Sequence, residues 1–111
     1  MIDKLNKFGA DTITGIKRCA NNENLYLRLV KTIPQNPGFN GLYEAIKNNN
    51  LDEAFSYAHG LKGILANLSL DPILNPIVEV TEHLRNKEKI DYSKYLNLIE
   101  EERKELENIL N

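Results

Sequence analysis

The feature that most constrains the fold is the spacing of apolar residues between Leu51 and Leu68. These residues recur at alternating intervals of three and four, and they are Leu51, Ala54, Ala58, Leu61, Leu65 and Leu68. An α-helix places such positions on one side, whereas a strand would divide them between two faces. The stretch is therefore predicted to be a long amphipathic helix with one face in a hydrophobic core.

Helical spacing recurs along the rest of the chain, and no run shows strand alternation bounded by turns. The expected helices cover Ile2–Phe8, Ile13–Cys19, Glu23–Ile33, Phe39–Lys47, Leu51–Leu68, a segment ending near Arg85, and Tyr95–Leu110. The segment ending near Arg85 either begins at Pro72 with a kink at Pro76 or begins at Pro76. The predicted fold class is all-α, an antiparallel four-helix bundle with short additional N-terminal helices.

Polar residues mark several of the predicted helix starts. Asp11 or Thr12 is expected to cap the second helix, Asn22 the third, and Asp91 or Ser93 to open the last. In the third helix the predicted apolar face consists of Leu25, Leu29 and Ile33, with Tyr26 and Val30 beside them.

Length and composition narrow the class of protein. The 111 residues suit a single domain, 1–111, with a bundle core of approximately 23–110. The net charge of −2, with scattered lysines and arginines, gives no reason to expect nucleic acid. No apolar run has the length of a membrane span or a signal peptide. A lone cysteine, Cys19, fits a reducing compartment, so we expect a cytoplasmic protein with no structural zinc site.

His59 is the candidate for chemistry. It lies about 100° around the helix from Ala58, on the border between core and solvent. A neutral imidazole, available near pH 7, can attack phosphorus and form a labile phosphoramidate. Lys62 follows one turn later as a point cation for phosphoryl oxygens, and Gly63 leaves clearance beside the ring. The residue types alone are equally compatible with a structural histidine at a helix border.

The stretch 58–68 reads AHGLKGILANL, which resembles the signature of histidine-containing phosphotransfer (HPt) domains. That signature is approximately A-H-x-[LI]-K-G, then small residues, then N/S-[LVF]-G. The matching residues are Ala58, His59, Leu61, Lys62, Gly63, Ala66, Asn67 and Leu68. Four departures stand beside them: Gly60 replaces the family's usual Thr or Ser, Ile64 and Leu65 replace small residues, and Ser69 replaces a glycine.

Other segments extend the resemblance over roughly residues 9 to 85. Gly15–Cys19 resembles the family's G-[LI]-x-R segment, and Asn24–Tyr26 resembles its L-Y helix. Leu42–Ile46 and Asn50–Ala54 are similar to the stretch that precedes the histidine helix.

The resemblance implies a bacterial-type phosphorelay protein with His59 as phosphoacceptor, Lys62 as phosphate-side cation and Gly63 as the clearance position. Its partners would be response-regulator receiver domains and a histidine kinase or hybrid kinase. Such a protein is a phosphocarrier and not an enzyme; it binds no ATP and needs no cofactor, because the receiver supplies Mg²⁺. We expect a stand-alone monomer.

Several alternatives remain at this stage. The chain is alternatively an HPt-like interaction module that carries no phosphate, or a phosphotransfer domain of a chemotaxis-type kinase. Cys19 would be a nucleophile if His59 approached it. Arg85 either reaches the phosphate side of the bundle or is a solvated helix end, and His83 is expected to favour the helix C-terminus by its partial charge.

Overall fold

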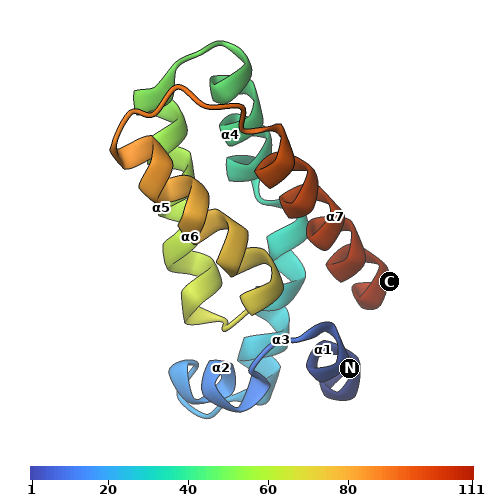
Figure 1. The fold of residues 1–111 in the computed structure, drawn as a ribbon. Coiled ribbons are helices and arrows are strands. Elements are labelled where there is room, and N and C mark those ends of the chain that lie inside the picture. Colours follow the sequence, from blue (N-terminus) through green and yellow to red (C-terminus); the bar gives the residue numbers. More distant parts are fainter.

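A computed structural model describes all 111 residues and contains helices and their connections but no strand. The helices are α1 (Ile2–Phe8), α2 (Thr12–Arg18), α3 (Glu23–Thr32), the 3₁₀ turn η1 (Ile33–Gln35), α4 (Pro37–Lys47), α5 (Leu51–Asn67), α6 (Asp71–Arg85) and α7 (Ser93–Leu110). The predicted all-α class is confirmed (Figure 1). None of these helices combines the length and apolar character that crossing a membrane requires.

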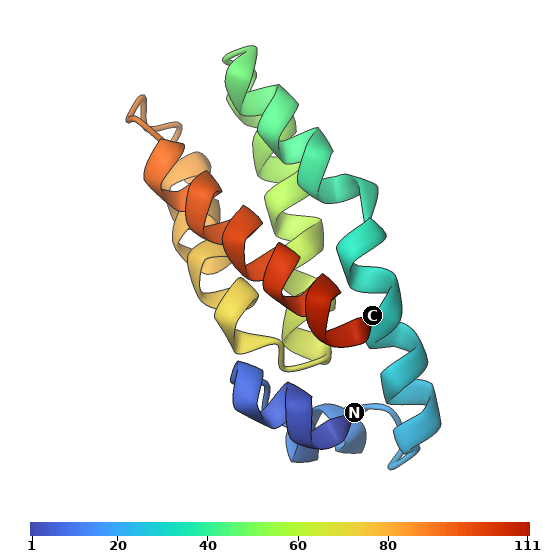
Figure 2. The same cartoon turned by 90° about the vertical axis from the view of Figure 1, so that its right-hand side faces the viewer.

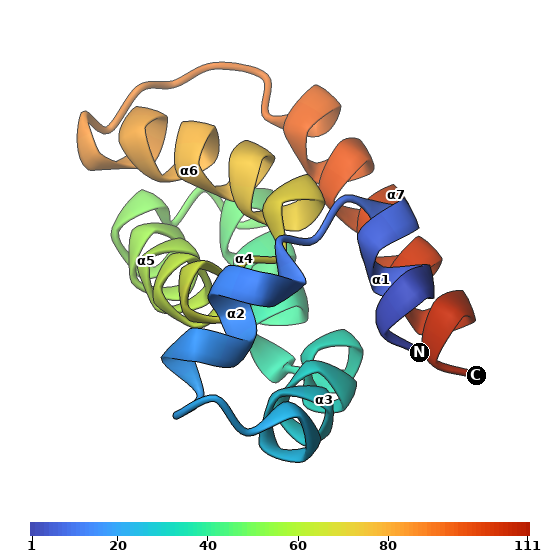
Figure 3. The ribbon, with the colours of Figure 1, turned by 90° about the horizontal axis from the view of Figure 1, so that it is seen from below.

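The long helices lie alongside one another, and the N-terminal helices close one end of them (Figure 1). α5 packs between α4 and α6, and α6 also packs against α7. α3 and α4 follow one another along a single column, with η1 at the break (Figure 2). At the opposite end from the α4–α5 turn, α1 lies beside α7 and α2 lies across the end of α5 (Figure 3).

The predicted apolar stripe of α5 lies in the core. Twenty-two buried apolar residues form one cluster, to which this stripe contributes Ala54, Ala58, Leu61, Leu65 and Leu68. Leu51, at the start of the helix, is only half-buried. The spacing argument thus orients α5 correctly and leaves the opposite side of the helix free for chemistry.

Side-chain caps explain where most helices begin. The side chains of Asp11, Asn22, Asn36 and Asn50 each accept a hydrogen bond from a backbone N–H in the first turn of α2, α3, α4 and α5. These acceptors satisfy donors that the helix itself leaves unpaired. The expected start of α4 at Phe39 was wrong, because Asn36 is the cap and Pro37 occupies the first helical position, where no N–H is needed.

The structure decides between the two predicted starts of this helix, because α6 begins at Asp71 and continues through Pro76. Leu70 is the residue before the helix, so α6 starts one residue earlier than the Pro72 alternative predicted. Pro76 lacks only the donor that would pair with the carbonyl of Pro72, and its ring is buried. A single lost hydrogen bond near the start of a helix is thus offset by burial.

Other predicted limits were wrong by one or two residues. α3 ends at Thr32, because Pro34 continues the chain as the 3₁₀ turn, and α5 ends at Asn67. α2 begins at Thr12 after the Asp11 cap, whereas α7 begins at Ser93, whose N–H donates to Asp91 Oδ1 at 2.9 Å.

The most buried face of α3 is rotated about the helix axis from the predicted face. Tyr26 and Val30 are fully buried, whereas Leu25 and Leu29 are half-buried. All four belong to one broad apolar side, and tertiary contacts determine its centre.

Candidate functional site

His59 lies in the middle of α5 on the side turned away from the core, and its side chain is exposed. The buried residues Ala58 and Leu61 precede and follow it, so the core stripe holds this helix while His59 faces solvent. An exposed imidazole is accessible to a reagent or to a partner protein.

The ring of His59 is not free to turn without cost, because it stacks on Phe55 one helical turn earlier. The two ring centroids lie 5.6 Å apart and the planes differ by 7°. Such offset aromatic pairs are worth about 0.5–1.5 kcal/mol beyond simple burial. The stack favours one ring orientation of the imidazole.

Arg85, at the end of α6, reaches the same site. Its guanidinium carbon lies 5.0 Å from the centroid of the Phe55 ring, and its Nε lies 3.5 Å from Glu82 Oε2. Of the two readings of Arg85 from sequence, the structure favours the one in which it reaches the His59 side, although its side chain remains 47% exposed. Contact between α5 and α6 brings together Arg85 and Phe55, 30 positions apart in the sequence, which local sequence does not reveal.

Lys62 supplies a second cation on this side of α5. It follows His59 by three positions, so the two side chains leave neighbouring parts of the helix surface. Its side chain is half-buried and takes part in none of the four salt bridges of the protein. The ammonium group is thus available to an anion held beside the imidazole.

The two glycines of the motif face open space. A Cβ atom added at Gly60 or at Gly63 would meet no heavy atom within 4 Å outside the local backbone of the helix. The chain's own packing does not require either glycine, so any clearance that Gly63 gives is for a molecule outside this chain. Ile64, next to Gly63, has an exposed fraction of 42%.

The residues upstream that resemble the HPt family form a clamp on the C-terminal end of α5. The hydroxyl of Tyr26 donates to the carbonyl of Leu68 at 3.0 Å, and Arg18 donates to the carbonyl of Ala66 and, at 3.3 Å, to Ser69 Oγ. A Cβ at Gly15 would lie 2.8 Å from the Leu68 carbonyl oxygen, so this position has no room for a side chain.

The serine at the family's glycine position has a specific backbone conformation. Ser69 has φ of 54°, in the left-handed region where glycine is favoured, and its N–H donates to the Ala66 carbonyl at 3.1 Å. Its hydroxyl gains the hydrogen bond from Arg18 described above. Sequence analysis noted Arg18 and Ser69 separately and missed that they form one contact.

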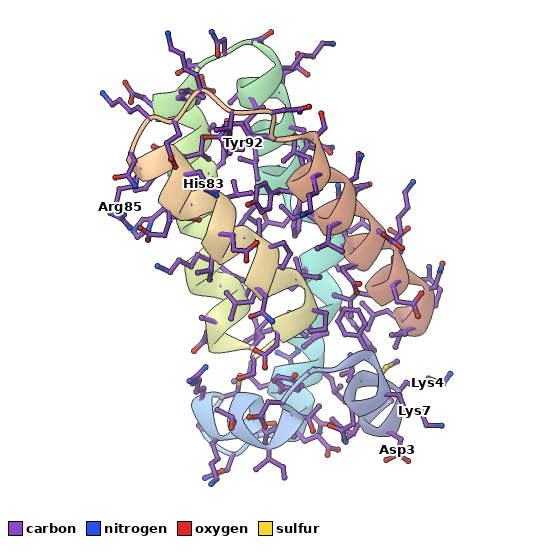
Figure 4. The ribbon with its side chains drawn as sticks, viewed as in Figure 1. Asp3, Lys4, Lys7, His83, Arg85 and Tyr92 are labelled. Carbon is purple, nitrogen blue, oxygen red and sulfur yellow. The ribbon has the colours of Figure 1, made fainter.

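His83 and Cys19 lie apart from His59. His83 Nδ1 lies 2.6 Å from Glu88 Oε2, and its Nε2 lies 3.1 Å from the hydroxyl of Tyr95. His83 and Arg85 leave α6 on opposite sides (Figure 4). Cys19 is 4% exposed and forms no hydrogen bond with His59, so the alternative of a paired cysteine nucleophile is wrong.

No group of three or more His, Cys, Asp or Glu side chains lies close enough together to hold a metal ion. What the His59 side of α5 offers is one exposed nucleophile, an aromatic support and two cations that face solvent. No protein-family model, no curated protein and no solved structure matches the chain.

Proposed function

We propose that the protein is a phosphocarrier of the HPt kind, which accepts a phosphoryl group on His59 and passes it on. The observation that carries the proposal is the exposed imidazole in the middle of α5, stacked on Phe55, with Lys62 and Arg85 on the same side. The AHGLKG motif places His59, Lys62 and Gly63 in the order that the HPt resemblance implies.

The arrangement of the helices supports the same proposal. The column of α3 and α4, together with α5, α6 and α7, is compatible with an antiparallel four-helix bundle of the HPt type. Hydrogen bonds join the first and last of these columns, since Tyr43 donates to Glu100 at 2.9 Å and Arg103 donates to Asn40 at 3.2 Å. The packing of α4 and α6 against α5 supports the helix behind the histidine.

The transfer would proceed by attack of a ring nitrogen of His59 on the phosphorus of an aspartyl phosphate. The nitrogen lone pair forms the P–N bond while the P–O bond to the aspartyl group breaks, and the aspartate leaves as a carboxylate. The proton on the other ring nitrogen then passes to water. Lys62 and Arg85 would neutralise the phosphoryl oxygens, and a receiver domain would bring the Mg²⁺.

Return of the phosphoryl group would reverse these steps on a second receiver. Its aspartate carboxylate attacks phosphorus, the P–O bond forms, and the P–N electron pair returns to the imidazole, which regains a proton. Because His59 is exposed, the partner must enclose the reacting atoms and exclude water.

The test is phosphotransfer from a panel of phosphorylated receiver domains to the purified protein. We expect an acid-labile, base-stable label on the wild type and on His83→Gln, and none on His59→Gln. If receivers bind both the wild type and His59→Gln equally and label neither, the chain is an interaction module. Exposed Ile64 is the feature that favours this second function. Labelling by ATP and a kinase catalytic domain, with no receiver present, would instead indicate a chemotaxis-type phosphotransfer domain.

A further inference from the structure

A hollow with a volume of about 520 Å³ lies at the end of the molecule that the α4–α5 turn occupies. The end of α4, the start of α5, the loop between α6 and α7, and the first turn of α7 surround it. Its lining residues are Tyr43, Ile46, Lys47, Asn49, Leu51, Lys89, Ile90, Asp91, Tyr92, Ser93 and Leu96. His59 is not among them, so the hollow is separate from the site described above.

The apolar part of the lining has a fixed shape, because its two tyrosines are anchored. Tyr92 is buried under the loop between α6 and α7, and its hydroxyl donates to the carbonyl of Glu88 at 2.7 Å (Figure 4). The hydroxyl of Tyr43 donates to Glu100 at 2.9 Å. Both hydroxyls therefore have partners within the protein, and these hydrogen bonds fix the positions of the two rings.

The loop that borders the hollow is held in place as well. His83, in the last turn of α6, contacts the Glu88 carboxylate at 2.6 Å. The Tyr92 hydroxyl donates to the carbonyl of the same residue, so two contacts hold Glu88 in the loop. Ile90 lies between Glu88 and Tyr92 in this loop, and 41% of it is exposed. An apolar side chain on an anchored loop gives the hollow an apolar border that a ligand can cover.

The charged residues of the lining are unequally satisfied. Lys47 and Lys89 take part in no salt bridge. Asp91 accepts the backbone N–H of Ser93 at 2.9 Å, and Asp52 beside the hollow lies 3.5 Å from Lys87 Nζ. The lining therefore carries two unpaired cations against one carboxylate that already serves the start of α7.

We propose that this hollow binds a small amphiphilic anion, an apolar body that carries one carboxylate, sulfonate or phosphate group. The body would cover Ile46, Leu51 and Ile90, and the anionic group would lie between the ammonium groups of Lys47 and Lys89. The volume falls within the range of small-molecule sites, and the lining offers both apolar and polar surface. The charge excess of the rim is what selects an anion over a neutral molecule of the same shape.

The test compares octanoate with octanol, two unbranched probes of eight carbons each that differ in charge. Each is titrated below its aggregation concentration into the ¹⁵N-labelled protein, and amide shifts are followed by NMR. We expect octanoate to shift amides of residues 46–51 and 89–96 and to bind about tenfold more tightly than octanol, the order expected for two exposed charge contacts. Equal affinities for the two probes, or shifts centred elsewhere, would overturn the proposal.

A matched pair of variants tests the role of the two lysines. Lys47→Glu/Lys89→Glu should lose the preference for octanoate and keep its affinity for octanol. Lys17→Glu/Lys31→Glu changes the net charge by the same amount at exposed positions outside the hollow and should leave both affinities unchanged. If both double variants weaken octanoate binding equally, net charge and not this site is responsible. If octanoate instead changes the rotational correlation time of the protein to that of a dimer, the hollow is a contact between copies and the proposal fails.

Discussion

The ring of Phe55 lies almost parallel to that of His59, with 7° between the planes and 5.6 Å between the centroids. A flexible exposed histidine samples several rotamers, whereas a stacked one spends more of its time in a single orientation. The relationship links a half-buried core-side residue to the exposed imidazole and gives the first prediction.

Phe55→Leu should slow phosphorylation of His59 by up to about tenfold, the factor that corresponds to an aromatic pair of 0.5–1.5 kcal/mol. The fold should persist, since leucine retains most of the apolar contact. Tyr57→Leu is the control, because Tyr57 is an exposed aromatic residue of the same helix that does not stack on His59. Phosphotransfer rates and thermal unfolding of both variants check this. Equal rates for the two variants would exclude an orienting role for Phe55.

Gly63→Ala should stabilise the protein and impair transfer at the same time. Nothing in the chain lies within 4 Å of the added methyl group, and alanine in a helix is favoured over glycine by about 0.5–1 kcal/mol. Gly60→Ala, equally open, should give the same gain in the free energy of unfolding with a smaller effect on transfer. Chemical denaturation and receiver-to-His59 phosphotransfer measure the two effects. A Gly63→Ala protein that transfers at the wild-type rate would mean that no partner needs this clearance.

Arg85→Gln should slow phosphotransfer with less than about 1 kcal/mol of change in stability, since the Arg85 side chain is 47% exposed and its pair with Glu82 is a surface ion pair. Removing the guanidinium takes away positive charge near the position that the phosphoryl group would occupy. Lys87→Gln is the control, because it removes an exposed cation from the loop after α6. The Nζ of Lys87 lies 3.5 Å from Asp52 Oδ1. Transfer rates at two salt concentrations should separate the variants, because only Arg85→Gln should show a weaker salt dependence than the wild type.

Arg103→Lys should cost about 1–3 kcal/mol in the free energy of unfolding. The guanidinium donates to the carbonyl of Pro34 at 2.8 Å and to Asn40 and Glu100 at 3.2 Å, so it ties α7 to η1 and α4. A lysine ammonium does not reproduce this fork of donors. Lys104→Arg, at the next and exposed position, should change stability by less than about 0.5 kcal/mol when both are unfolded in urea.

Tyr26 should contribute to alkaline unfolding. Burial raises the pKa of its hydroxyl to about 12, while an unfolded tyrosine titrates near pH 10. The unfolded chain therefore loses its proton first, so this contribution is intact below about pH 10 and is lost as the pH rises towards about 12.

The measurement is urea unfolding of wild type and Tyr26→Phe from about pH 8 to about pH 12. Tyr26→Phe should cost about 1 kcal/mol at neutral pH, because the Leu68 carbonyl loses its donor, and should show a shallower decline at high pH. Part of the decline should remain, since burial also raises the pKa values of Tyr43 and Tyr92. Identical declines in the two proteins would contradict the assignment.

Local physics explains which parts of the fold were predictable from sequence. The α5 stripe follows from residue spacing alone, and the cap at Asn22 follows from one side chain and the helix beside it. The start of α6 could not be predicted from local sequence, because Pro72 and Pro76 each satisfy the local rules for a helix start. Burial of Pro76 decides between them. Local sequence rules do not determine a helix start that depends on tertiary packing.

The candidate site divides in the same way. The angle of His59 to the core stripe predicted a place on the border between core and solvent, and the structure exposes its side chain. The place of Lys62 follows from its distance along the helix. The contact of Arg85 with Phe55 depends on how α6 lies against α5, and the contact of His83 with Tyr95 depends on the return of the chain in α7. Neither contact has a signature in the local sequence, so both are seen only in the folded structure.

The clamp on the end of α5 has a consequence for the order of events during synthesis. Tyr26 and its acceptor at Leu68 are separated by 42 residues, and Arg18 and its acceptor at Ala66 by 48. At translation rates of roughly 5–20 residues per second, the donors leave the ribosome about 2–10 s before their acceptors leave it. The N-terminal helices must therefore wait, with the Tyr26 ring uncovered, until α5 has emerged and gives them a surface on which to close.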